Sequence, residues 1–397
     1  MSDNKKPDIR FKGYSDDWEQ RKLGELVDRV VRKNTNNEST LPLTISAQYG
    51  LVDQITYFNN RVASRDVSNY YLVLNGEFAY NKSTSDGYPF GAVKRLDLYE
   101  KGVLSTLYIV FAPRKERQID SNFLTVFFDT DRWHKGVAER AAEGARNHGL
   151  LNISAGDFFD IDLSVPKDVA EQKRIGAFIR QLDTLITLHQ RKYDKLQNFK
   201  KAMLEKMFPK NGSNVPEIRF KGFTDAWEQR KLGELAEIVG GGTPSTSVES
   251  YWDGDIDWYA PAEIGEQIYL KSSQRKITEE GLNKSSAKVL PVGTVLFTSR
   301  AGIGKTAILL KEGCTNQGFQ SIVPNKNKLD SYFIFTRSEE LKRYGETVGA
   351  GSTFVEVSGK QMANMELMMP TTMDEQQKIG EYFSNLDNLI TLHQRKP

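Results

Sequence analysis

The chain has 397 residues, of which 39% are hydrophobic and 27% charged, a composition typical of a folded protein with two or three domains. Its formal net charge is +2, so charge alone does not identify a nucleic-acid-binding protein, although basic residues can be concentrated locally. Cys314 is the only cysteine, which excludes intramolecular disulfides and cysteine-based zinc sites. With no signal peptide in the opening segment and no apolar run of ~18 residues, we expect a cytoplasmic protein.

Two blocks of sequence occur twice. Residues 7–26 (PDIRFKGYSDDWEQRKLGEL) and 216–235 (PEIRFKGFTDAWEQRKLGEL) are identical at sixteen of twenty positions. A second block, EQKRIGAFIRQLDTLITLHQRK, begins at Glu171 and returns as EQQKIGEYFSNLDNLITLHQRK at Glu375. The spacing is far longer than the ~20–50 residues of a solenoid repeat, so the pattern indicates a duplicated domain. The inserts between the blocks look unrelated to each other. This suggests that the repeated blocks form one shared frame and that each insert forms a separate recognition domain, called a head below.

In chain order, each half begins with a helix signal. Asp16-x-x-Glu19 and Asp225-x-x-Glu228 resemble capping boxes, so we predict that a helix begins at each. Within the inserts, residues 70–74, 104–111 and 293–297 are rich in β-branched and aromatic residues and are predicted to be strands. Frequent Gly, Pro, Asn and Ser residues interrupt them. The sequence therefore predicts α/β or α+β heads with long loops.

Each half closes with a long helix of heptad character. Residues 171–208 carry an apolar seam with alternating steps of four and three, which predicts a helix ~57 Å long that packs against a partner helix. A shorter copy of the seam lies near residue 397, and the twofold character of the repeat predicts an antiparallel pair. The seam positions are Ile175, Ile179, Leu182, Ile186, His189, Tyr193, Leu196, Lys200, Met203 and Met207 in the first helix and Ile379, Phe383, Leu386, Ile390 and His393 in the second.

One motif resembles a nucleotide-binding loop. Gly304-Lys305-Thr306 matches the end of GxxxxGK[ST], but position 299, where the first glycine belongs, is Ser. A loop relieved by glycines that carries Arg and Lys also suits phosphate or base contacts, and an ordinary solvated turn is a further alternative. His189 and His393 are repeat equivalents on the seam, which favours packing over metal binding. We find no motif of a catalytic centre.

Polar, aromatic and basic residues are interleaved in the loops of both inserts. Amides, hydroxyls, guanidinium groups and free backbone N–H groups are the groups that read base edges and hold phosphates. The candidate DNA-binding residues of the first insert are Tyr80, Asn81, Lys82, Ser83, Ser85, Tyr88, Lys94, Arg95 and Arg146. Those of the second insert are Gly242, Thr243, Ser245, Thr298, Arg300, Gly302, Lys305, Asn316, Gln317, Ser352 and Thr353.

These motifs together resemble the specificity subunits of type I restriction–modification systems. The resemblance extends over essentially the whole chain. It rests in the second insert on residues 241–245 (GGTPS), 251–258 (YWDGDIDW), 298–305 (TSRAGIGK), 315–318 (TNQG) and 351–353 (GST). In the first insert it rests on residues 50–53 (GLVD), 80–83 (YNKS), 88–91 (YPFG) and 105–108 (STLY), and the closing helices are similar to the family's spacers.

The resemblance implies two target-recognition domains separated by two antiparallel helices, and no catalysis in this chain. It implies double-stranded DNA as ligand, two methylation subunits and motor-nuclease subunits as partners, and S-adenosylmethionine, ATP and Mg²⁺ on those partners. We predict a first recognition domain at 1–165, a spacer helix at 166–208, a linker at 209–215, a second recognition domain at 216–370 and a distal spacer helix at 371–397.

The predicted function is to read a bipartite, asymmetric DNA target, one half with each head. The helices would act as a ruler, since paired modules on B-DNA usually contact half-sites about one turn apart. Two alternatives stay open. One is a DNA-binding regulator without enzyme partners, and the other is a P-loop NTPase.

Overall fold

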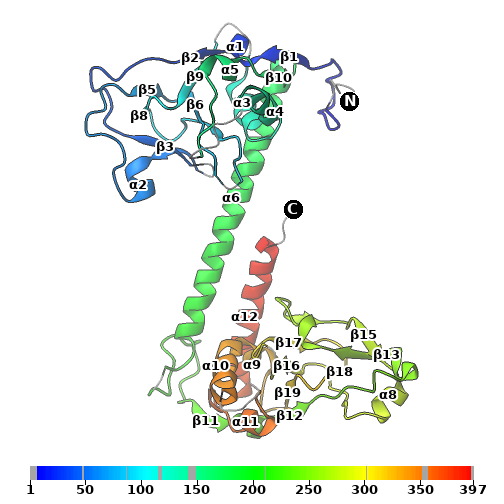
Figure 1. Ribbon diagram of the computed structural model, residues 1–397. Coiled ribbons are helices and arrows are strands. Elements are labelled where there is room, and N and C mark those ends of the chain that lie inside the picture. Colours follow the sequence, from blue (N-terminus) through cyan, green and yellow to red (C-terminus); the bar gives the residue numbers. More distant parts are fainter. Residues whose placement is uncertain are drawn as a thin grey trace. The chain divides into compact units, whose positions relative to one another are not determined.

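The computed structural model describes residues 7–46, 49–85, 87–114, 119–141, 149–210, 212–300, 302–350 and 356–394. The chain divides into two compact units, Met1–Thr187 (unit 1) and Leu188–Pro397 (unit 2). The boundary lies inside helix α6 (Val169–Lys206), which the sequence analysis assigned to a separate spacer (Figure 1). Helix α12 (Met373–Gln394) closes unit 2. In the described part of the chain, no helix is both long and apolar enough to cross a membrane.

The opening block of each unit forms a strand and a short helix. In unit 1, β1 (Glu19–Lys22) pairs antiparallel with β10 (Asp162–Val165) and is followed by α1 (Leu23–Leu26). In unit 2, β11 (Glu228–Lys231) pairs in the same way with β20 (Glu366–Met369) and is followed by α7 (Leu232–Leu235).

The helices predicted to begin at the Asp16-x-x-Glu19 and Asp225-x-x-Glu228 motifs are therefore wrong, because both glutamates begin strands. The backbone groups of β1 and β11 are taken up by distant strands, and this tertiary pairing overrides the local capping signal. The indole of Trp18 packs edge-to-face on Phe123, with ring centroids 6.0 Å apart.

The head of unit 1 is built on an antiparallel sheet with the strand order β2-β9-β6-β7. These strands are β2 (Val27–Arg29), β9 (Ile109–Pro113), β6 (Phe78–Asn81) and β7 (Ala92–Arg95). Two further pairs join β3 (Leu43–Ser46) to β4 (Gly50–Asp53) and β5 (Tyr71–Leu74) to β8 (Lys101–Leu104). The strand predicted at 70–74 is confirmed as β5. The single strand predicted at 104–111 is wrong, because a turn in which Tyr108 N donates to Ser105 O (3.2 Å) separates β8 from β9.

The head of unit 2 repeats this sheet and adds to it. Its order is β12-β19-β16-β17-β14, formed by β12 (Ala236–Gly240), β19 (Gln320–Pro324), β16 (Val295–Phe297), β17 (Thr306–Leu309) and β14 (Tyr269–Leu270). A three-stranded sheet holds β15 (Arg275–Ile277), β13 (Trp252–Tyr259) and β18 (Gly313–Thr315). The first four strands of the larger sheet occupy the positions of β2-β9-β6-β7. The two inserts therefore share a sheet although their sequences look unrelated. The strand predicted at 293–297 is β16.

Corresponding helices follow the sheets. Unit 1 contains α2 (Gln54–Phe58), α3 (Ser121–Phe128), α4 (His134–Arg140) and α5 (Ala155–Phe159). Unit 2 contains the 3₁₀ turns η1 (Glu249–Tyr251) and η2 (Pro261–Glu263) and helices α8 (Glu279–Asn283), α9 (Ser331–Thr336), α10 (Ser338–Gly349) and α11 (Gly359–Ala363). An aspartate caps α3 and α9, and serine capping boxes begin α5 and α11.

Two equivalent ion pairs tie the opening block to the closing helix of each unit. Arg10 Nε lies 2.6 Å from Glu171 Oε1 in unit 1, and Arg219 Nε lies 2.7 Å from Glu375 Oε1 in unit 2. Both glutamates are only 1% exposed, and each accepts two hydrogen bonds from its arginine. The two repeated blocks therefore form one structural frame in each unit, which explains why they are duplicated together.

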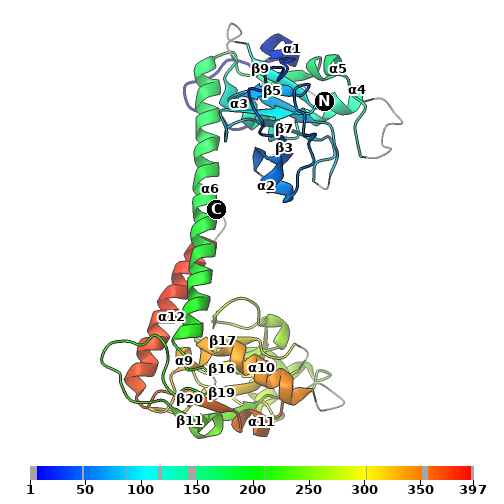
Figure 2. The same ribbon diagram turned by 90° about the vertical axis from the view of Figure 1, so that its left-hand side faces the viewer.

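In unit 2, α12 lies antiparallel beside the C-terminal half of α6 (Figures 1 and 2). Lys200 Nζ lies 2.6 Å from Asp387 Oδ1, and the Nδ1 atoms of His189 and His393 are 3.0 Å apart. The apolar seam residues of α12 are buried against α6 and the head: Ile379, Phe383, Leu386 and Ile390. The predicted antiparallel pairing is confirmed here.

The seam of α6 is not covered along its whole length. Ile175 packs on the core of unit 1, but Leu182 and Ile186 are 39% and 56% exposed. No described residue covers these two seam positions.

Candidate nucleic-acid interface

Each head has a hairpin loop, and the two loops occupy the same position in the corresponding sheets of the two units. In unit 1, residues 82–91 connect β6 to β7, and in unit 2, residues 298–305 connect β16 to β17. Each loop forms an isolated antiparallel bridge to the segment that precedes the last short helix of its head, α5 in unit 1 and α11 in unit 2. The bridge joins Ser83 to Leu150 in unit 1 and Arg300 to Glu356 in unit 2. Ser83 and Arg300 are therefore equivalent positions that carry different chemistry.

The loop of unit 2 is held together by the side chain of Thr298. Its hydroxyl donates to the carbonyl oxygen of Gly302 (2.7 Å) and accepts from the backbone N–H of Lys305 (2.9 Å). Gly302 and Gly304 have φ angles of +104° and +98°, a region that side chains rarely adopt. These hydrogen bonds and backbone angles fix the described residues of the loop relative to one another.

Helix α10 packs against this loop. The side chain of Ile303 is buried and faces Gly345 and Gly349 of α10. A Cβ atom at Gly304 would lie 2.3 Å from Lys342 Cγ, so Lys342 lies directly against the loop. Glycine is needed at 304 because of both its backbone angle and this neighbour. The side chain of Ile303 fixes the loop to the head, and the polar residues around it are left for solvent or a ligand.

Arg300 and Lys305 are the cationic side chains that the loop presents. Arg300 is half-buried and Lys305 is exposed. Neither forms an ion pair with any described residue, unlike Arg21, Lys22, Arg140 and Lys94, which all do. Cations that have no carboxylate partner among the described residues can bind an external anion.

Two further loops of unit 2 meet the 298–305 loop. Gly242 N donates to Thr315 O (2.8 Å), and the hydroxyl of Thr243 donates to the side-chain oxygen of Gln317. Ser299 N donates to Gly318 O (2.8 Å), which joins these loops to the hairpin loop. The structure thus gathers predicted residues from three separate stretches of sequence: Gly242, Thr243, Ser245, Arg300, Gly302, Lys305, Asn316 and Gln317.

The exposed residues predicted on the loop of unit 1 carry hydroxyls, and its predicted cation, Lys82, is half-buried. Thr84 N donates to Gly149 O (2.7 Å), and Ser85 and Tyr88 exchange backbone hydrogen bonds of 2.9 and 3.3 Å. Ser83, Ser85 and Tyr88 are exposed, while Asn81 and Lys82 are half-buried. These five predicted residues lie together on one loop.

Four predicted residues lie in positions that do not suit contact with DNA. Tyr80 is fully buried, its ring stacks on Phe158 with centroids 4.3 Å apart, and burial raises its pKa. Thr298 is fully buried, and its hydroxyl holds the loop together as described above. Lys94 and Arg95 lie at the end of β7 away from the loop, paired with Asp129 and Asp97 at 2.6 Å each. Packing and ion pairing explain these four residues.

Three predicted residues, Arg146, Ser352 and Thr353, lie outside the described residues.

Sequence reasoning missed two basic residues beside the unit 2 loops. Lys342 reaches the hairpin loop from α10, and the guanidinium carbon of Arg275 lies 3.7 Å from the ring centroid of Trp252. The indole N–H of Trp252 donates to Ser245 O (3.1 Å), so Arg275 is positioned beside the 240–245 loop. A lysine on a surface helix has no motif, and the signal for Arg275 lies only in the aromatic residues of the 251–258 segment.

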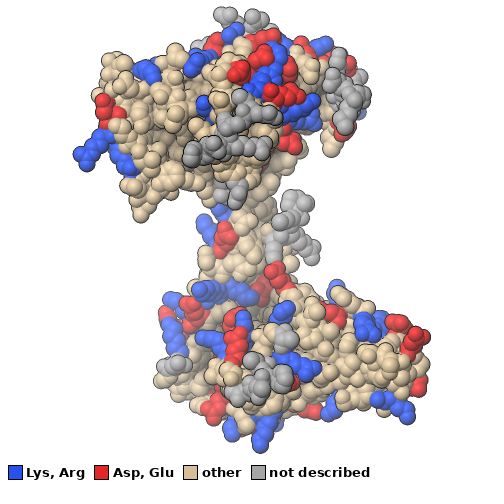
Figure 3. Space-filling model, in the orientation of Figure 1, with Lys and Arg blue, Asp and Glu red and all other residues tan. Residues whose placement is uncertain are grey.

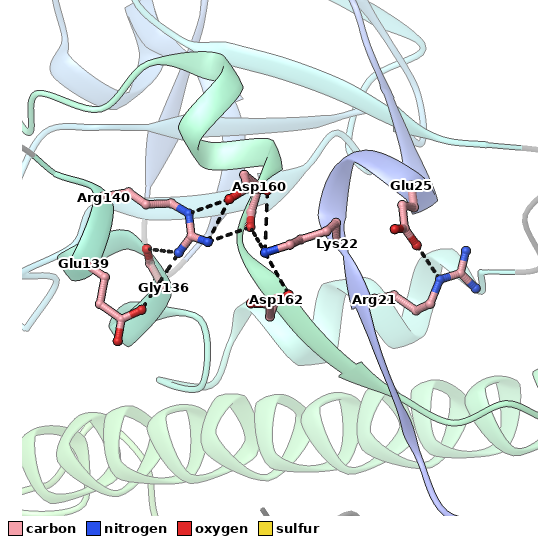
Figure 4. Close-up of polar contacts among 8 residues, drawn as sticks. All are labelled: Arg21, Lys22, Glu25, Gly136, Glu139, Arg140, Asp160 and Asp162. Atoms are coloured by element: carbon pink, nitrogen blue, oxygen red, sulfur yellow. Dashed lines mark hydrogen bonds and ion pairs between the residues drawn. The ribbon is translucent and has the colours of Figure 1, made fainter.

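Some basic residues outside the loops are paired with carboxylates. On the face shown in Figure 3, Lys and Arg lie among Asp and Glu in both units. Figure 4 shows one such cluster on the frame of unit 1, where Lys22 Nζ lies 3.0 Å from Asp162 Oδ1 and Arg140 Nη2 lies 2.9 Å from Asp160 Oδ2. The hydrogen bond from Arg140 lowers the pKa of Asp160, so this carboxylate stays charged.

The geometry argues against the nucleotide-binding alternative. In a P-loop, a helix follows the GK[ST] residues and its N-terminal N–H groups hold the phosphates. Here Thr306 begins strand β17 instead. Cys314 is buried, and burial raises the pKa of its thiol to about 11, so it is a packing residue rather than a nucleophile.

Comparison with known proteins identifies the family. Residues 15–198 and 224–397 each match the family described as "Type I restriction modification DNA specificity domain". The type I restriction enzyme MjaIX specificity subunit of Methanocaldococcus jannaschii is 37% identical over 167 residues, which cover 41% of this chain and 38% of that protein. The chain thus spans well under half the length of this relative.

Two other proteins match over nearly their whole length. The putative type I restriction enzyme MjaX specificity subunit of the same organism is 23% identical over 399 residues, covering 96% of this chain and 89% of that protein. The crystal structure of the type I restriction–modification system S subunit from M. genitalium shares the fold, with a TM-score of 0.59 and 13% identity over 98% of this chain and 94% of that one. Because the family match covers well over half of the chain and occurs twice, the protein belongs to the type I restriction–modification DNA specificity family.

Proposed function

We propose that this chain reads a bipartite DNA sequence, one half with each head, and directs partner subunits to it. The observation that carries the proposal is the pair of equivalent hairpin loops. Each loop connects the corresponding two strands of the sheet in its own unit and is bridged to the corresponding later segment. At the bridged position, one loop has Ser83 and the other has Arg300. A common support with different surface chemistry is what two readers of different half-sites require, so the proposed target is asymmetric.

The side chains on each loop suit particular roles. Arg300 can form two parallel hydrogen bonds with guanine O6 and N7 in the major groove. Lys305 and Lys342 suit phosphate oxygens, which supply affinity without sequence information. The hydroxyls and amide of the unit 1 loop can read base edges by donating or accepting. The hydrogen bonds of Thr298 hold Gly302 and Lys305 in place, which limits the entropy lost on binding.

The proposal places all chemistry on other chains. In the family, methylation subunits supply S-adenosylmethionine chemistry, and motor-nuclease subunits use ATP and Mg²⁺; we propose that two of the former and also the latter assemble with this chain. The paired α6 and α12 helices would set the distance between half-sites. The proposed bounds of heads and spacers are those given from the sequence.

The test is to purify the chain from its native host and to map modified adenines in that host's genome. We expect a methyltransferase subunit to co-purify and a methylated sequence with two defined halves and a fixed gap. Deletion of this chain's gene should abolish that methylation. A chain that purifies alone from the host, with methylation unchanged after deletion, would instead support a regulator without enzyme partners.

A further inference from the structure

Two tryptophan side chains hold the 240–245 loop in the head of unit 2. Trp252 and Trp258 both belong to β13, and their rings meet edge-to-face with centroids 5.1 Å apart. Each indole N–H donates to a carbonyl oxygen of the loop, Trp252 to Ser245 (3.1 Å) and Trp258 to Gly242 (2.9 Å). The tryptophans are only 7% and 6% exposed, so the pair forms a fixed support for the loop.

The side chain of Arg275 lies on this support. Arg275 belongs to β15, where its Cα is the partner of Trp258 Cα across the strand pair (Figure 1). Its guanidinium carbon lies 3.7 Å from the ring centroid of Trp252 and 5.8 Å from that of Trp258. A cation over an indole ring is attracted by the electrons of the ring, and the N–H donors at the edge of the guanidinium stay available. The stack therefore orients the guanidinium group without using its donors.

Arg275 differs in this respect from two lysines beside the same sheet. Lys311 Nζ lies 2.8 Å from Asp257 Oδ2, and Lys276 Nζ lies 4.0 Å from Asp257 Oδ1. Asp257 is fully buried, so these two lysines compensate a charge inside the head. Arg275 is exposed, and no described residue forms an ion pair with it. Its donors are therefore available to a ligand.

The surroundings of Arg275 favour a base over a phosphate as that ligand. Glu263 Oε2 accepts a hydrogen bond from the backbone N–H of Gln274 (2.7 Å), the residue before Arg275. This carboxylate repels a phosphate group, but it does not repel the neutral edge of a base.

The loop that the tryptophans hold belongs to the candidate interface of unit 2. Gly242 N donates to Thr315 O, and Ser299 N donates to Gly318 O, each at 2.8 Å. These bonds join the 240–245 loop to the 298–305 loop through residues 315–318. Arg275 is therefore held on the same set of loops as the predicted base-reading residues of this head.

We propose that Arg275 reads a guanine in the half-site bound by unit 2, and that Trp252 is its positioning residue. Two N–H groups of the guanidinium match the O6 and N7 acceptors that guanine presents in the major groove. The inference rests on the proposed function, because it requires the head of unit 2 to bind DNA. It adds to that head a second arginine reader, which comes from a different sheet than Arg300.

The test measures DNA binding by the complex assembled with methylation subunits, on the duplex whose sequence methylation mapping identifies. Further duplexes each carry one substituted base pair, and fluorescence anisotropy gives the affinity for every duplex. We expect Arg275→Ala to weaken binding of the matched duplex by about tenfold and to remove discrimination at one guanine of the second half-site. Arg275→Lys keeps the charge but lacks the paired donors, so discrimination at that base pair should stay lost.

The positioning role of Trp252 is tested by where its variants act. Trp252→Leu removes the ring and should abolish discrimination at the same base pair as Arg275→Ala, while Trp252→Phe keeps an aromatic face and should retain most of it. A purely structural role would weaken binding to every duplex alike. Lys276→Ala is the matched control, because this neighbour of Arg275 on β15 lies near Asp257, and the variant should bind as wild type.

The proposal is overturned if Arg275→Ala binds every duplex as wild type does. It is also overturned if Arg275→Ala weakens all duplexes alike and lowers the salt slope by about one unit, because the contact would then be to a phosphate. A wild-type complex that does not distinguish the matched duplex from a scrambled one overturns the proposed function itself, and this inference with it. Thermal unfolding of each variant separates loss of the contact from loss of the fold.

Discussion

The frame and the heads of this chain are both repeated in structure, but only the frame is also repeated in sequence. In the frame, nearly identical sequences give identical contacts, down to Arg10–Glu171 and Arg219–Glu375. In the heads, unrelated sequences give the same sheet because both keep apolar residues at the buried strand positions. All three residues of β16 are buried, as are the first three of β6. The comparison teaches that packing pattern specifies this sheet, which leaves the loop residues free to differ.

The largest expected effect comes from exchanging one head. Replacement of residues 27–150 with the corresponding insert of another family member would carry both the unit 1 loop and its bridging segment at Leu150. The frame of unit 1 would keep β1, β10 and the Arg10–Glu171 pair. We expect one half of the methylated sequence to change completely while the other half and the gap stay the same, as genome-wide methylation mapping would show. A change in both halves would contradict the assignment of one half to each head.

The second prediction concerns the frame itself. Glu375→Ala leaves Arg219 without its partner in a nearly closed site, and we expect a loss of about 3 kcal/mol in the free energy of unfolding of unit 2. Glu171→Ala should destabilise unit 1 in the same way. Chemical denaturation followed by tryptophan fluorescence measures both. If either variant unfolds like wild type, the two ion pairs do not hold the repeated blocks together.

Much of the frame could be predicted from sequence, because its two blocks each occur twice in the chain and its closing helix follows a heptad pattern. The wrong helices at Asp16 and Asp225 show the limit of local signals. A capping pattern cannot report that the next four residues pair with a strand more than a hundred residues away.

The candidate site was predicted in outline and missed in detail for a related reason. Polar and glycine-rich loop sequence predicted residues that the structure places on the two equivalent hairpins, and three of the unit 2 loops do meet. Sequence did not separate Thr298, which is fully buried and holds its loop together, from Arg300, which is half-buried and forms no ion pair with a described residue. Burial is decided by strand register, and Lys342 enters only through the packing of α10 on Gly304.

The third prediction tests the equivalence of the two loops. Arg300→Ala removes a group able to bond guanine twice, and we expect binding to weaken by about 1–3 kcal/mol with relaxed selectivity in the second half-site. Ser83→Ala, at the equivalent position of unit 1, should affect only the other half-site and by less, because it removes a single neutral hydrogen bond. The measurement is binding of matched and mismatched duplexes by the assembled complex. Relaxed selectivity in the same half-site for both variants would show that the heads do not read separately.

The smallest expected effect comes from replacing a single exposed lysine, and it is compared with the replacement of a lysine that is held in an ion pair. Lys305 is exposed, and no described residue forms an ion pair with it, so Lys305→Ala should weaken binding to all sequences alike. The slope of log affinity against log salt should fall by about one unit, because one counterion fewer is released from the DNA. Lys22 is the matched control, since its ammonium group is already held by Asp162, and Lys22→Ala should leave the salt slope unchanged. The two slopes are measured on the assembled complex over the same salt series. If Lys22→Ala lowers the slope and Lys305→Ala does not, the phosphate contact lies on the frame of unit 1 and the 298–305 loop is a solvated turn.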